Sequence, residues 1–254
     1  MNRLPPRILM RCDGGAFSCG CRVRHTGKVW WIIMTDTEKK ALFKSAVEIL
    51  KEEYPEASCS LRYEGDPWRL LIMARLSAQC TDARVNIVSE ELFGSYPTAE
   101  SMAAGELSDI EDIVRPCGLF HVKAKDIKAI SCEIVSRFGG RVPDTMEELL
   151  SLPGVGRKIA NLILGDVFGV PGVVTDTHCI RICGRLGAYD ESMKTPAVAE
   201  RILLSLVEPE EQTDFCHRLV LFGRDVCTAR SPRCGDCRLG AICTHKKAAS
   251  EAAG

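Results

Sequence analysis

The chain has 254 residues, of which 46% are hydrophobic and 26% charged, and its formal net charge is −1. This composition excludes a disordered chain and is sufficient for one large or two modest domains with a hydrophobic core. A net charge near zero also excludes a uniformly basic nucleic-acid-binding protein, so any such surface must be a local patch. No apolar run approaches the length of a membrane span.

Residues 1–33 differ in composition from the rest of the chain and carry three cysteines: Cys12, Cys19 and Cys21. A second metal site is conceivable there, but the spacing matches no motif, and a disordered extension is favoured. The apolar run at 29–34 is too short for a signal peptide. As a separate hypothesis, Met34 is a candidate translation start. With no secretory signal, we expect free thiols and a cytoplasmic protein, nucleoid-associated if prokaryotic.

From Thr35 onward the sequence predicts one helix after another. Residues 38–54 place Leu42, Phe43 and Val47 on a stripe with a period of 3.6 residues, and Asp66 precedes a helix that Pro67 opens. Further helices are predicted over residues 68–79, 82–93, 98–104, 108–114, 122–138, 145–151, 155–168, 176–186, 196–207 and 212–227. No sustained alternating pattern indicates strands, so the predicted fold class is all-α.

Residues 149–161 read LLSLPGVGRKIAN and predict two helices joined by a tight turn. Gly154 and Gly156 permit backbone conformations closed to other residues and a close approach of another backbone. The second helix would present unpaired N–H groups, which together with its dipole attract a phosphate. Gly154, Val155, Gly156 and Arg157 are therefore candidate contacts to a nucleic-acid backbone, although a Gly-x-Gly turn by itself is also common in plain helix–helix connections.

Lys158 falls in the first turn of this second helix, where the helix dipole disfavours a cation. A neutral lysine amine can act as a nucleophile, although a solvated lysine is the simpler interpretation. Asp176 follows an apolar run and directly precedes another amphipathic helix, so it is either a helix cap or a catalytic carboxylate. The two residues together suit sugar chemistry, in which an amine attacks C1′ and a carboxylate stabilises positive charge.

Four cysteines near the C-terminus follow the spacing C-x6-C-x2-C-x5-C: Cys227, Cys234, Cys237 and Cys243. Thiolates this close in sequence hold either a tetrahedral Zn²⁺ ion or an iron–sulfur cluster. The first gap contains Arg230 and Arg233, which predicts a basic loop closed by the metal centre.

The runs LPGVGRKIAN and VTDTH, LSAQCTD at 76–82, GLFHVKAKDI at 118–127 and the cysteine spacing occur in the order typical of one family. Over about residues 38–245 the chain resembles endonuclease III, a family of helix–hairpin–helix DNA glycosylases with AP lyase activity and an iron–sulfur cluster. The resemblance implies a two-lobed all-α fold. A six-helix barrel lobe would span 60–170, a cluster lobe 34–59 plus 171–245, and a disordered tail 246–254.

The resemblance also implies roles for single residues. Lys158 matches the Schiff-base lysine and Asp176 the catalytic aspartate. Gln79 and Leu119 match the polar and apolar wedges that fill the helix when a base is flipped out, and His178 would lie near Asp176. The four cysteines would hold a [4Fe–4S] cluster, with the loop of Arg230 and Arg233 against the DNA backbone.

Four features depart from the family pattern: Arg75, Pro116-Cys117, His121 and Ile159. Arg75 replaces an aliphatic residue and is either a surface residue with its charge in water or a new pocket group. These positions place the usual preference for oxidised pyrimidines in question.

We therefore expect a monomeric, bifunctional DNA glycosylase and AP lyase acting on double-stranded DNA with damaged bases, oxidised pyrimidines first, or with abasic sites. Alternatives are a monofunctional glycosylase for uracil or mismatches, which Lys158 disfavours, and a non-catalytic iron–sulfur DNA-binding protein. Zinc in the cysteine quartet would give a colourless protein.

Overall fold

A computed structural model describes residues 24–25, 28–29 and 34–253 of the protein. Within this part the structure is helical, apart from strands β1 (Arg24–His25) and β2 (Lys28–Val29), which pair antiparallel. The predicted all-α fold class is confirmed. The disordered extension over residues 1–33 stays a prediction, although residues 24–25 and 28–29 within it pair with one another. The three N-terminal cysteines lie outside the described residues.

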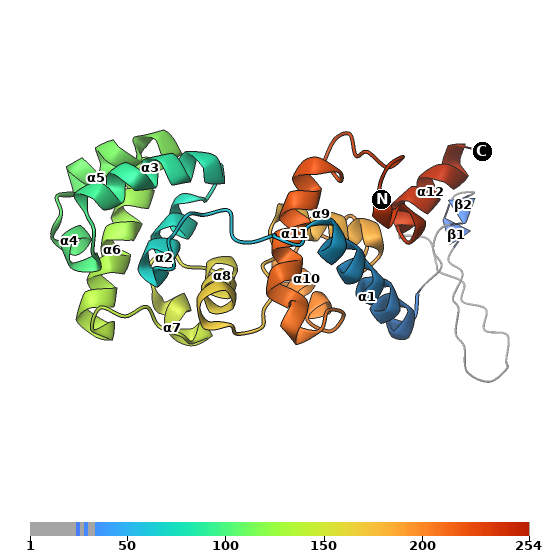
Figure 1. Ribbon diagram of the computed structural model, residues 1–254, viewed down its shortest axis with the longest axis horizontal. Helices are drawn as coiled ribbons and strands as arrows, with labels where there is room; N and C mark the ends of the chain where they lie inside the picture. Colours follow the sequence, from blue (N-terminus) through green and yellow to red (C-terminus); the bar gives the residue numbers. More distant parts are fainter. Residues whose placement is uncertain (1–23, 26–27, 30–33, 254) are drawn as a thin grey trace, which may run out of the picture.

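The helices form two groups that lie side by side (Figure 1). The first lobe consists of α2–α8, and the second lobe combines α1 with α9–α12. The segment 54–66 connects α1 to α2 and so crosses between the lobes. The α-helices are α1 (Asp36–Glu53), α2 (Pro67–Leu76), α3 (Asp82–Ser95), α4 (Ala99–Ala104), α5 (Leu107–Val114), α6 (Phe120–Phe138), α7 (Met146–Ser151), α8 (Arg157–Phe168), α9 (Thr177–Leu186), α10 (Pro196–Leu203), α11 (Gln212–Asp225) and α12 (Thr244–Ala253). Three short 3₁₀ turns complete the described fold: η1 (Arg115–Cys117), η2 (Pro209–Glu211) and η3 (Arg238–Ala241).

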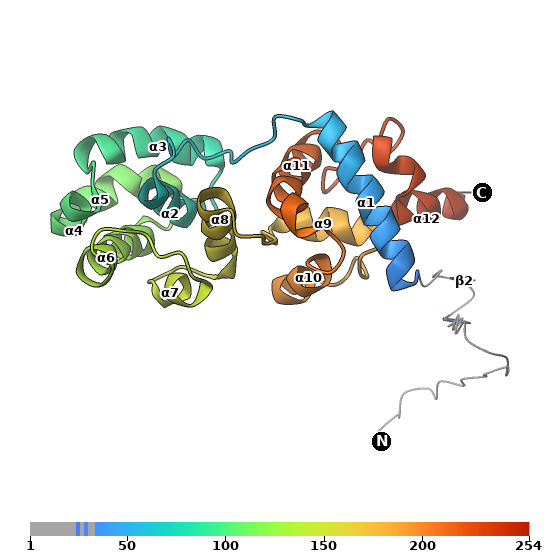
Figure 2. The ribbon, with the colours of Figure 1, turned by 60° about the horizontal axis from the view of Figure 1, so that its bottom comes forward.

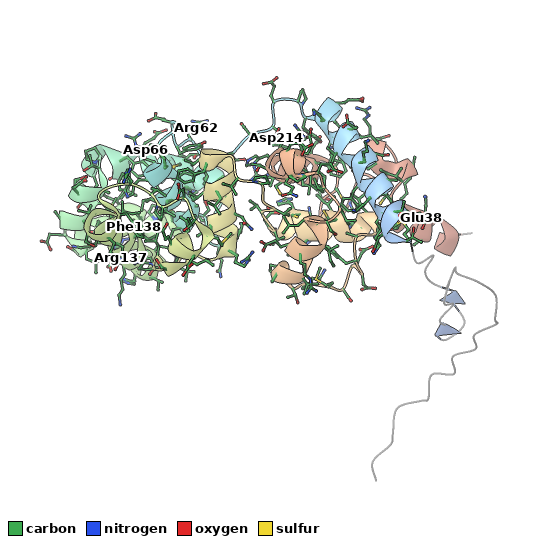
Figure 3. The ribbon with its side chains drawn as sticks, turned by 90° about the horizontal axis from the view of Figure 1, so that it is seen from below. Glu38, Arg62, Asp66, Arg137, Phe138 and Asp214 are labelled. Atoms are coloured by element: carbon green, nitrogen blue, oxygen red, sulfur yellow. The ribbon has the colours of Figure 1, made fainter. Side chains whose placement is uncertain are left out.

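Short polar side chains define where many of these helices begin. Thr35 and Glu38 form a reciprocal capping box at the start of α1, where Figure 3 shows Glu38. Asp66 accepts hydrogen bonds from the backbone N–H groups of Trp68 and Arg69, and Pro67 occupies the first position of α2. These helix starts were predictable because the capping groups are close in sequence.

The first lobe packs around a core supplied by α2, α3, α6, α7 and α8. Short helices α4 and α5 both pack against α6, and α2 packs against α8. Arg137 and Phe138 close the C-terminal end of α6, with the guanidinium 5.0 Å from the ring centroid (Figure 3). This lobe contains seven α-helices among the described residues where the resemblance implied six, and two of them, α4 and α7, have only six residues each.

The second lobe has its own core, built where α1 packs on α11. The rings of Phe43 and Phe215 meet edge to face at 6.3 Å. Arg218, almost fully buried, donates hydrogen bonds to Glu211 and Asp214 at 3.0 and 2.9 Å; Figure 3 labels Asp214 in this lobe. Packing with α11 explains why α1, although first in sequence, belongs with the C-terminal helices.

Helix α8 joins the two lobes. Asp166 on α8 lies 2.7 Å from His217 Nε2 on α11, and a Cβ at Gly165 would meet the Thr213 hydroxyl at 2.7 Å. Arg224 on α11 donates a 2.6 Å hydrogen bond to Asp82 on α3. The predicted domain boundaries stay a prediction, but these contacts show that α3 and α8 of the first lobe touch α11 of the second.

The C-terminal segment differs from the expectation. Residues 244–253 form helix α12, whereas the prediction was a disordered tail at 246–254. Thr244 Oγ1 donates to the Arg185 carbonyl at 2.9 Å, and His245 pairs with Glu191 at 2.7 Å. These two contacts anchor the start of α12 on the second lobe. None of the described helices is both long and apolar enough to cross a lipid bilayer.

Candidate active site

The predicted hairpin is present as α7, a turn at 152–156 and α8. Val155 N–H donates to the Leu152 carbonyl at 3.2 Å, and the Val155 side chain is buried in the first-lobe core at 7% exposure. Of Val155, therefore, only the backbone is available to a ligand. Gly154 has φ +68°, a left-handed conformation that favours glycine, so the turn depends on this residue.

Gly156 is the N-cap residue of α8 and has an extended backbone with φ −103°. It has no side chain with which to cap the first N–H groups of the helix. Gly156, Arg157 and Lys158 are all exposed. The start of α8 thus offers outward-facing backbone donors and the positive end of a helix dipole, which suits an anion such as a phosphate.

Arg157 does not point freely into solvent. Its guanidinium makes a bidentate ion pair with Glu200 on α10, at 2.9 Å from Nε and 2.5 Å from Nη2. Half of the arginine side chain is exposed, but its charge is matched by a buried carboxylate. The predicted DNA contact of Arg157 is therefore combined with a structural link between the lobes.

Asn161 completes this link, one helical turn after Arg157. Its Nδ2 donates to Glu200 Oε1 at 3.0 Å and to the Val173 carbonyl at 3.1 Å. Burial raises the pKa of Glu200, but the hydrogen bonds from Arg157 and Asn161 and the arginine charge outweigh it and lower the pKa overall. The sequence analysis overlooked Asn161 and Glu200. The one available signal was the spacing of Arg157 and Asn161, which puts both on one face of α8.

The segment between α8 and α9 runs back along α8. Val170 N–H donates to the Leu164 carbonyl at 2.9 Å, and Gly172 packs so closely that a Cβ would lie 3.3 Å from Asn161 Oδ1. The Val173 carbonyl then meets Asn161, only three residues from Lys158. Figure 2 shows this short connection between α8 and α9. The chain three residues before Asp176 is thus held against α8, within one turn of Lys158.

Asp176 is the N-cap residue of α9 and is partly buried. Its Oδ1 accepts a 2.7 Å hydrogen bond from Cys179 N–H, so the capping role weighed for this residue is real. The cap uses one carboxylate oxygen, which leaves a chemical role for the other possible. Burial lowers the pKa of His178, and its Nδ1 lies 3.2 Å from Arg181 Nη2.

Gln79 and Leu119 lie at the tips of two neighbouring loops. Both are exposed and both have left-handed backbones, with φ +54° and +49°. Non-glycine residues seldom adopt this conformation, and it concentrates at functional sites. Leu119 is 58% exposed and is therefore not the core leucine that a simpler interpretation would make it.

Two cysteines next to these tips indicate that the loops lie together. Cys80 follows Gln79, Cys117 precedes Gly118-Leu119, and η1 packs on α3. Burial, together with the neighbouring Cys80 thiol, raises the pKa of Cys117 to about 11. The polar and the apolar residue thus project from adjacent loops of the first lobe.

The C-terminal cysteines border one pocket in the second lobe, which is partly open to solvent. All four line it: Cys227, Cys234, Cys237 and Cys243. Arg185 Nη1 donates a hydrogen bond to Cys227 Sγ at 3.2 Å. Among the described residues, no three His, Cys, Asp or Glu side chains converge closely enough to bind a single metal ion.

A family model for the HhH-GPD superfamily base excision DNA repair proteins matches residues 72–209, which include the hairpin, Lys158 and Asp176. The curated Endonuclease III of Synechocystis sp. is 43% identical over 211 residues, covering 83% of this chain and 95% of that protein. The chain belongs to the endonuclease III family. The family predicted from the motifs is thereby confirmed.

Solved structures agree with this membership in the endonuclease III family. A structure described as a non-covalent Endonuclease III–DNA complex superimposes with a TM-score of 0.79 at 35% identity, covering 86% of this chain and all of that one. A trapped Endonuclease III–DNA covalent intermediate gives the same TM-score, identity and coverage.

The departures from the endonuclease III pattern have distinct surroundings. His121 is exposed and pairs with Glu111 at 2.8 Å, while Ile159 packs partly buried against the first-lobe core. Arg75 forms an ion pair with Asp126 beneath the hairpin turn. Of the basic loop residues, Arg230 is exposed, whereas Arg233 donates to the Asp225 carbonyl at 2.6 Å.

Proposed function

We propose that the protein is a bifunctional DNA glycosylase and AP lyase of base excision repair, with Lys158 as nucleophile and Asp176 as its acid–base partner. The hydrogen bond from Asn161 to the Val173 carbonyl gives the strongest support, because it holds the segment before Asp176 against α8, within one turn of Lys158. Relatives solved as DNA complexes, one of them a covalent intermediate, support the same assignment.

The chemistry starts at C1′ of the damaged nucleotide. The Lys158 amine forms a bond to C1′ while the bond from C1′ to the base breaks, and the departing base takes a proton from water. Asp176 accepts the proton that the lysine nitrogen loses and stabilises positive charge on the sugar. The C1′–O4′ bond then breaks, O4′ takes up the proton held by Asp176, and an iminium ion forms between Lys158 and C1′.

Strand cleavage follows from the same iminium ion. It acidifies the C2′ protons, and loss of one of them breaks the C3′–O3′ bond, which cuts the strand on the 3′ side of the lesion. Water then hydrolyses the C=N bond and frees Lys158. A monofunctional glycosylase would use water at C1′ and would have no need of an exposed lysine at this position.

DNA binding would combine two sets of contacts. The backbone donors at Gly154, Gly156 and Arg157 would hold a phosphate without reading sequence. Gln79 and Leu119 would enter the helix from their adjacent loops when the damaged base rotates out, offsetting part of the cost of unstacking. The exposed tips and the uncapped start of α8 support these roles.

We infer that the four cysteines hold a [4Fe–4S] cluster. A zinc ion with Zn–S bonds of about 2.3 Å would need the four sulfurs within about 4 Å of one another. All four thiols line one pocket, and membership in the endonuclease III family favours the cluster over a zinc ion. When bound, the cluster would cross-link the end of α11 to the segment before α12 and orient the loop of Arg230 toward DNA. His178 and Arg233 would support this surface rather than carry out chemistry.

The substrate class is double-stranded DNA with oxidised pyrimidines or abasic sites, by similarity to the family, and a cytoplasmic or nucleoid location would match it. A panel of oligonucleotides with oxidised pyrimidines, uracil, mismatches and abasic sites tests the preference directly. Uracil or mismatch removal as the main activity would favour the monofunctional alternative.

Borohydride trapping tests the mechanism, because it reduces the iminium ion to a stable secondary amine between protein and DNA. We expect a covalent complex with the wild-type protein and none with Lys158→Ala, while the two bind DNA alike. Lys40→Ala, an exposed lysine on α1 in the other lobe, is the matched control and should trap normally. Binding without trapping or turnover on every lesion would support the non-catalytic alternative.

A further inference from the structure

Arg75 lies near the C-terminal end of α2, whose other residues are largely buried and apolar. Its Nε and Nη2 lie 2.8 and 2.6 Å from Oδ2 of Asp126 on α6. The side chains are only 13% and 19% exposed. Arg75 is therefore neither a surface residue with its charge in water nor a group in an open pocket. It is half of a largely buried ion pair that joins two helices of the first lobe.

The hairpin turn packs directly on this ion pair. A Cβ placed on Gly154 would lie 2.5 Å from Asp126 Oδ2 and 2.6 Å from Arg75 Nε. The Cα of Gly154 therefore rests against both charged groups. The backbone at this position is left-handed, so the turn has little freedom to move away. The ion pair therefore lies directly beneath the turn that leads into α8.

The two charges also matter for any anion above the turn. A lone carboxylate at Asp126 would repel a phosphate bound at the hairpin, because partly buried charges are weakly screened. The guanidinium of Arg75 cancels that repulsion while filling the space against Gly154. An aliphatic residue at position 75, as is usual in the family, would leave the Asp126 carboxylate without this partner.

We propose that Arg75 and Asp126 are positioning residues for DNA binding. They support the hairpin turn at Gly154, and their opposite charges cancel beneath the phosphate that the hairpin binds. This inference rests on the proposed function, since it requires the hairpin to bind the DNA backbone. Arg75 thus contributes to the affinity for DNA, and not to the choice of lesion or to the chemical step.

Four variants separate the effect of the side-chain packing beneath Gly154 from the effect of the two charges. They are Arg75→Leu, Arg75→Lys, Asp126→Asn and the double variant Arg75→Leu/Asp126→Asn. The measurement is the Kd for duplex DNA with a non-cleavable abasic-site analogue, by fluorescence anisotropy, at two salt concentrations. We expect Arg75→Leu to raise Kd about tenfold, most at low salt, because it exposes a lone carboxylate. Removing that carboxylate in the double variant should bring Kd back to within about threefold of wild type, and Arg75→Lys should do the same.

Asp126→Asn leaves a lone cation under the phosphate, so its Kd should not exceed the wild-type value. Trapping rates at saturating DNA should stay within about threefold of wild type in all four variants, because the chemical step is untouched. Arg69→Leu is the matched control, since Arg69 lies on the same helix and pairs with Glu64, away from the hairpin. It should leave Kd unchanged, and thermal melting checks that each variant is folded.

The inference is overturned if Arg75→Leu binds like wild type, or if the double variant binds as weakly as Arg75→Leu. Should Arg75→Leu fail to fold, the comparison of Asp126→Asn and Arg75→Lys with wild type still decides, because weaker binding by Asp126→Asn contradicts the charge argument. A wild-type protein that gives no borohydride trap would instead refute the proposed function. Normal trapping with unaltered Arg75→Leu binding would refute only the role of the ion pair.

Discussion

Asn161 on α8 and Glu200 on α10 are joined by a 3.0 Å hydrogen bond across the junction between the two lobes. The same amide nitrogen binds the Val173 carbonyl, and the same carboxylate binds Arg157. One buried network therefore fixes the start of α8, the start of α10 and the segment that leads to Asp176. Catalysis by a lysine and an aspartate on different helices requires this kind of support, because small displacements of reacting groups are costly.

The two roles of Asp176 can be separated. Asparagine caps a helix as well as aspartate does, so Asp176→Asn should leave the free energy of unfolding within about 0.5 kcal/mol of wild type. If the carboxylate also transfers protons, glycosylase turnover should fall by about 100-fold or more. Denaturant titration and single-turnover kinetics measure the two effects. Asp176→Ala should lose both activity and about 1 kcal/mol of stability. Full activity of Asp176→Asn would reduce this residue to a cap.

Glu200→Gln should weaken the junction in a pH-dependent way. The pKa of Glu200 is lowered from 4.5 in the folded protein, so its contribution is fully present above about pH 4.5 and is lost as pH falls through the folded-state value. At pH 7 we expect Glu200→Gln to unfold with a free energy about 1–3 kcal/mol smaller than wild type. Denaturant titrations from pH 7 to pH 3.5 should show this gap closing. A gap that is constant with pH would mean that the charge of Glu200 is unimportant.

Gly156→Ser tests the phosphate site without disturbing the fold. The backbone there has φ −103°, and a Cβ would meet no atom within 4 Å. Serine is a good N-cap residue, so stability should be unchanged or rise by a few tenths of a kcal/mol. Its hydroxyl would, however, accept hydrogen bonds from the N–H groups that otherwise bind the phosphate. The Kd for DNA should therefore rise about tenfold. Tighter or equal DNA binding would contradict a phosphate at the start of α8.

Leu119→Gly should separate stability from function in the opposite loop. Glycine relieves the left-handed backbone but loses more entropy on folding, and the exposed leucine buries little, so stability should stay within about 1 kcal/mol of wild type. Loss of the apolar wedge should lower excision of a base from duplex DNA about tenfold or more. Excision from single-stranded DNA, where no stack has to be opened, is the internal control. Equal losses on both substrates would argue against a wedge.

Cys234→Ser should remove the cluster. The expected results are loss of broad visible absorbance, less than four iron atoms per protein, and a lower melting temperature, because metal binding energy is folding energy in such sites. Cys132→Ser is the matched control, since Cys132 is exposed on α6 and does not line the pocket. A colourless wild-type protein that contains one zinc ion would refute the cluster assignment.

The sequence alone predicted most helix starts, because caps act within three or four residues, as Asp66 does for α2. It was weaker on helix ends. Helix α2 stops at Leu76 rather than at the predicted residue 79, where Gln79 turns left-handed, and α10 stops at Leu203 rather than at 207. An apolar periodicity continues through such turns, so it does not reveal where the backbone changes direction.

Order and spacing of motifs also identified the family from sequence, and they predicted Lys158, Asp176 and the cysteine quartet as its reactive groups, since each motif is a short run whose chemistry is carried by residue type. The tertiary structure decided which of the charged residues pair with each other. Asp126 is 51 residues from Arg75, and Glu200 is 43 residues from Arg157. Ion pairs between elements depend on which helix faces touch, and α1 packing beside α11 could not be read from either segment. Local sequence rules determine the helices and the candidate reactive groups. Only tertiary packing determines the hydrogen bonds and ion pairs between helices that hold those groups in position.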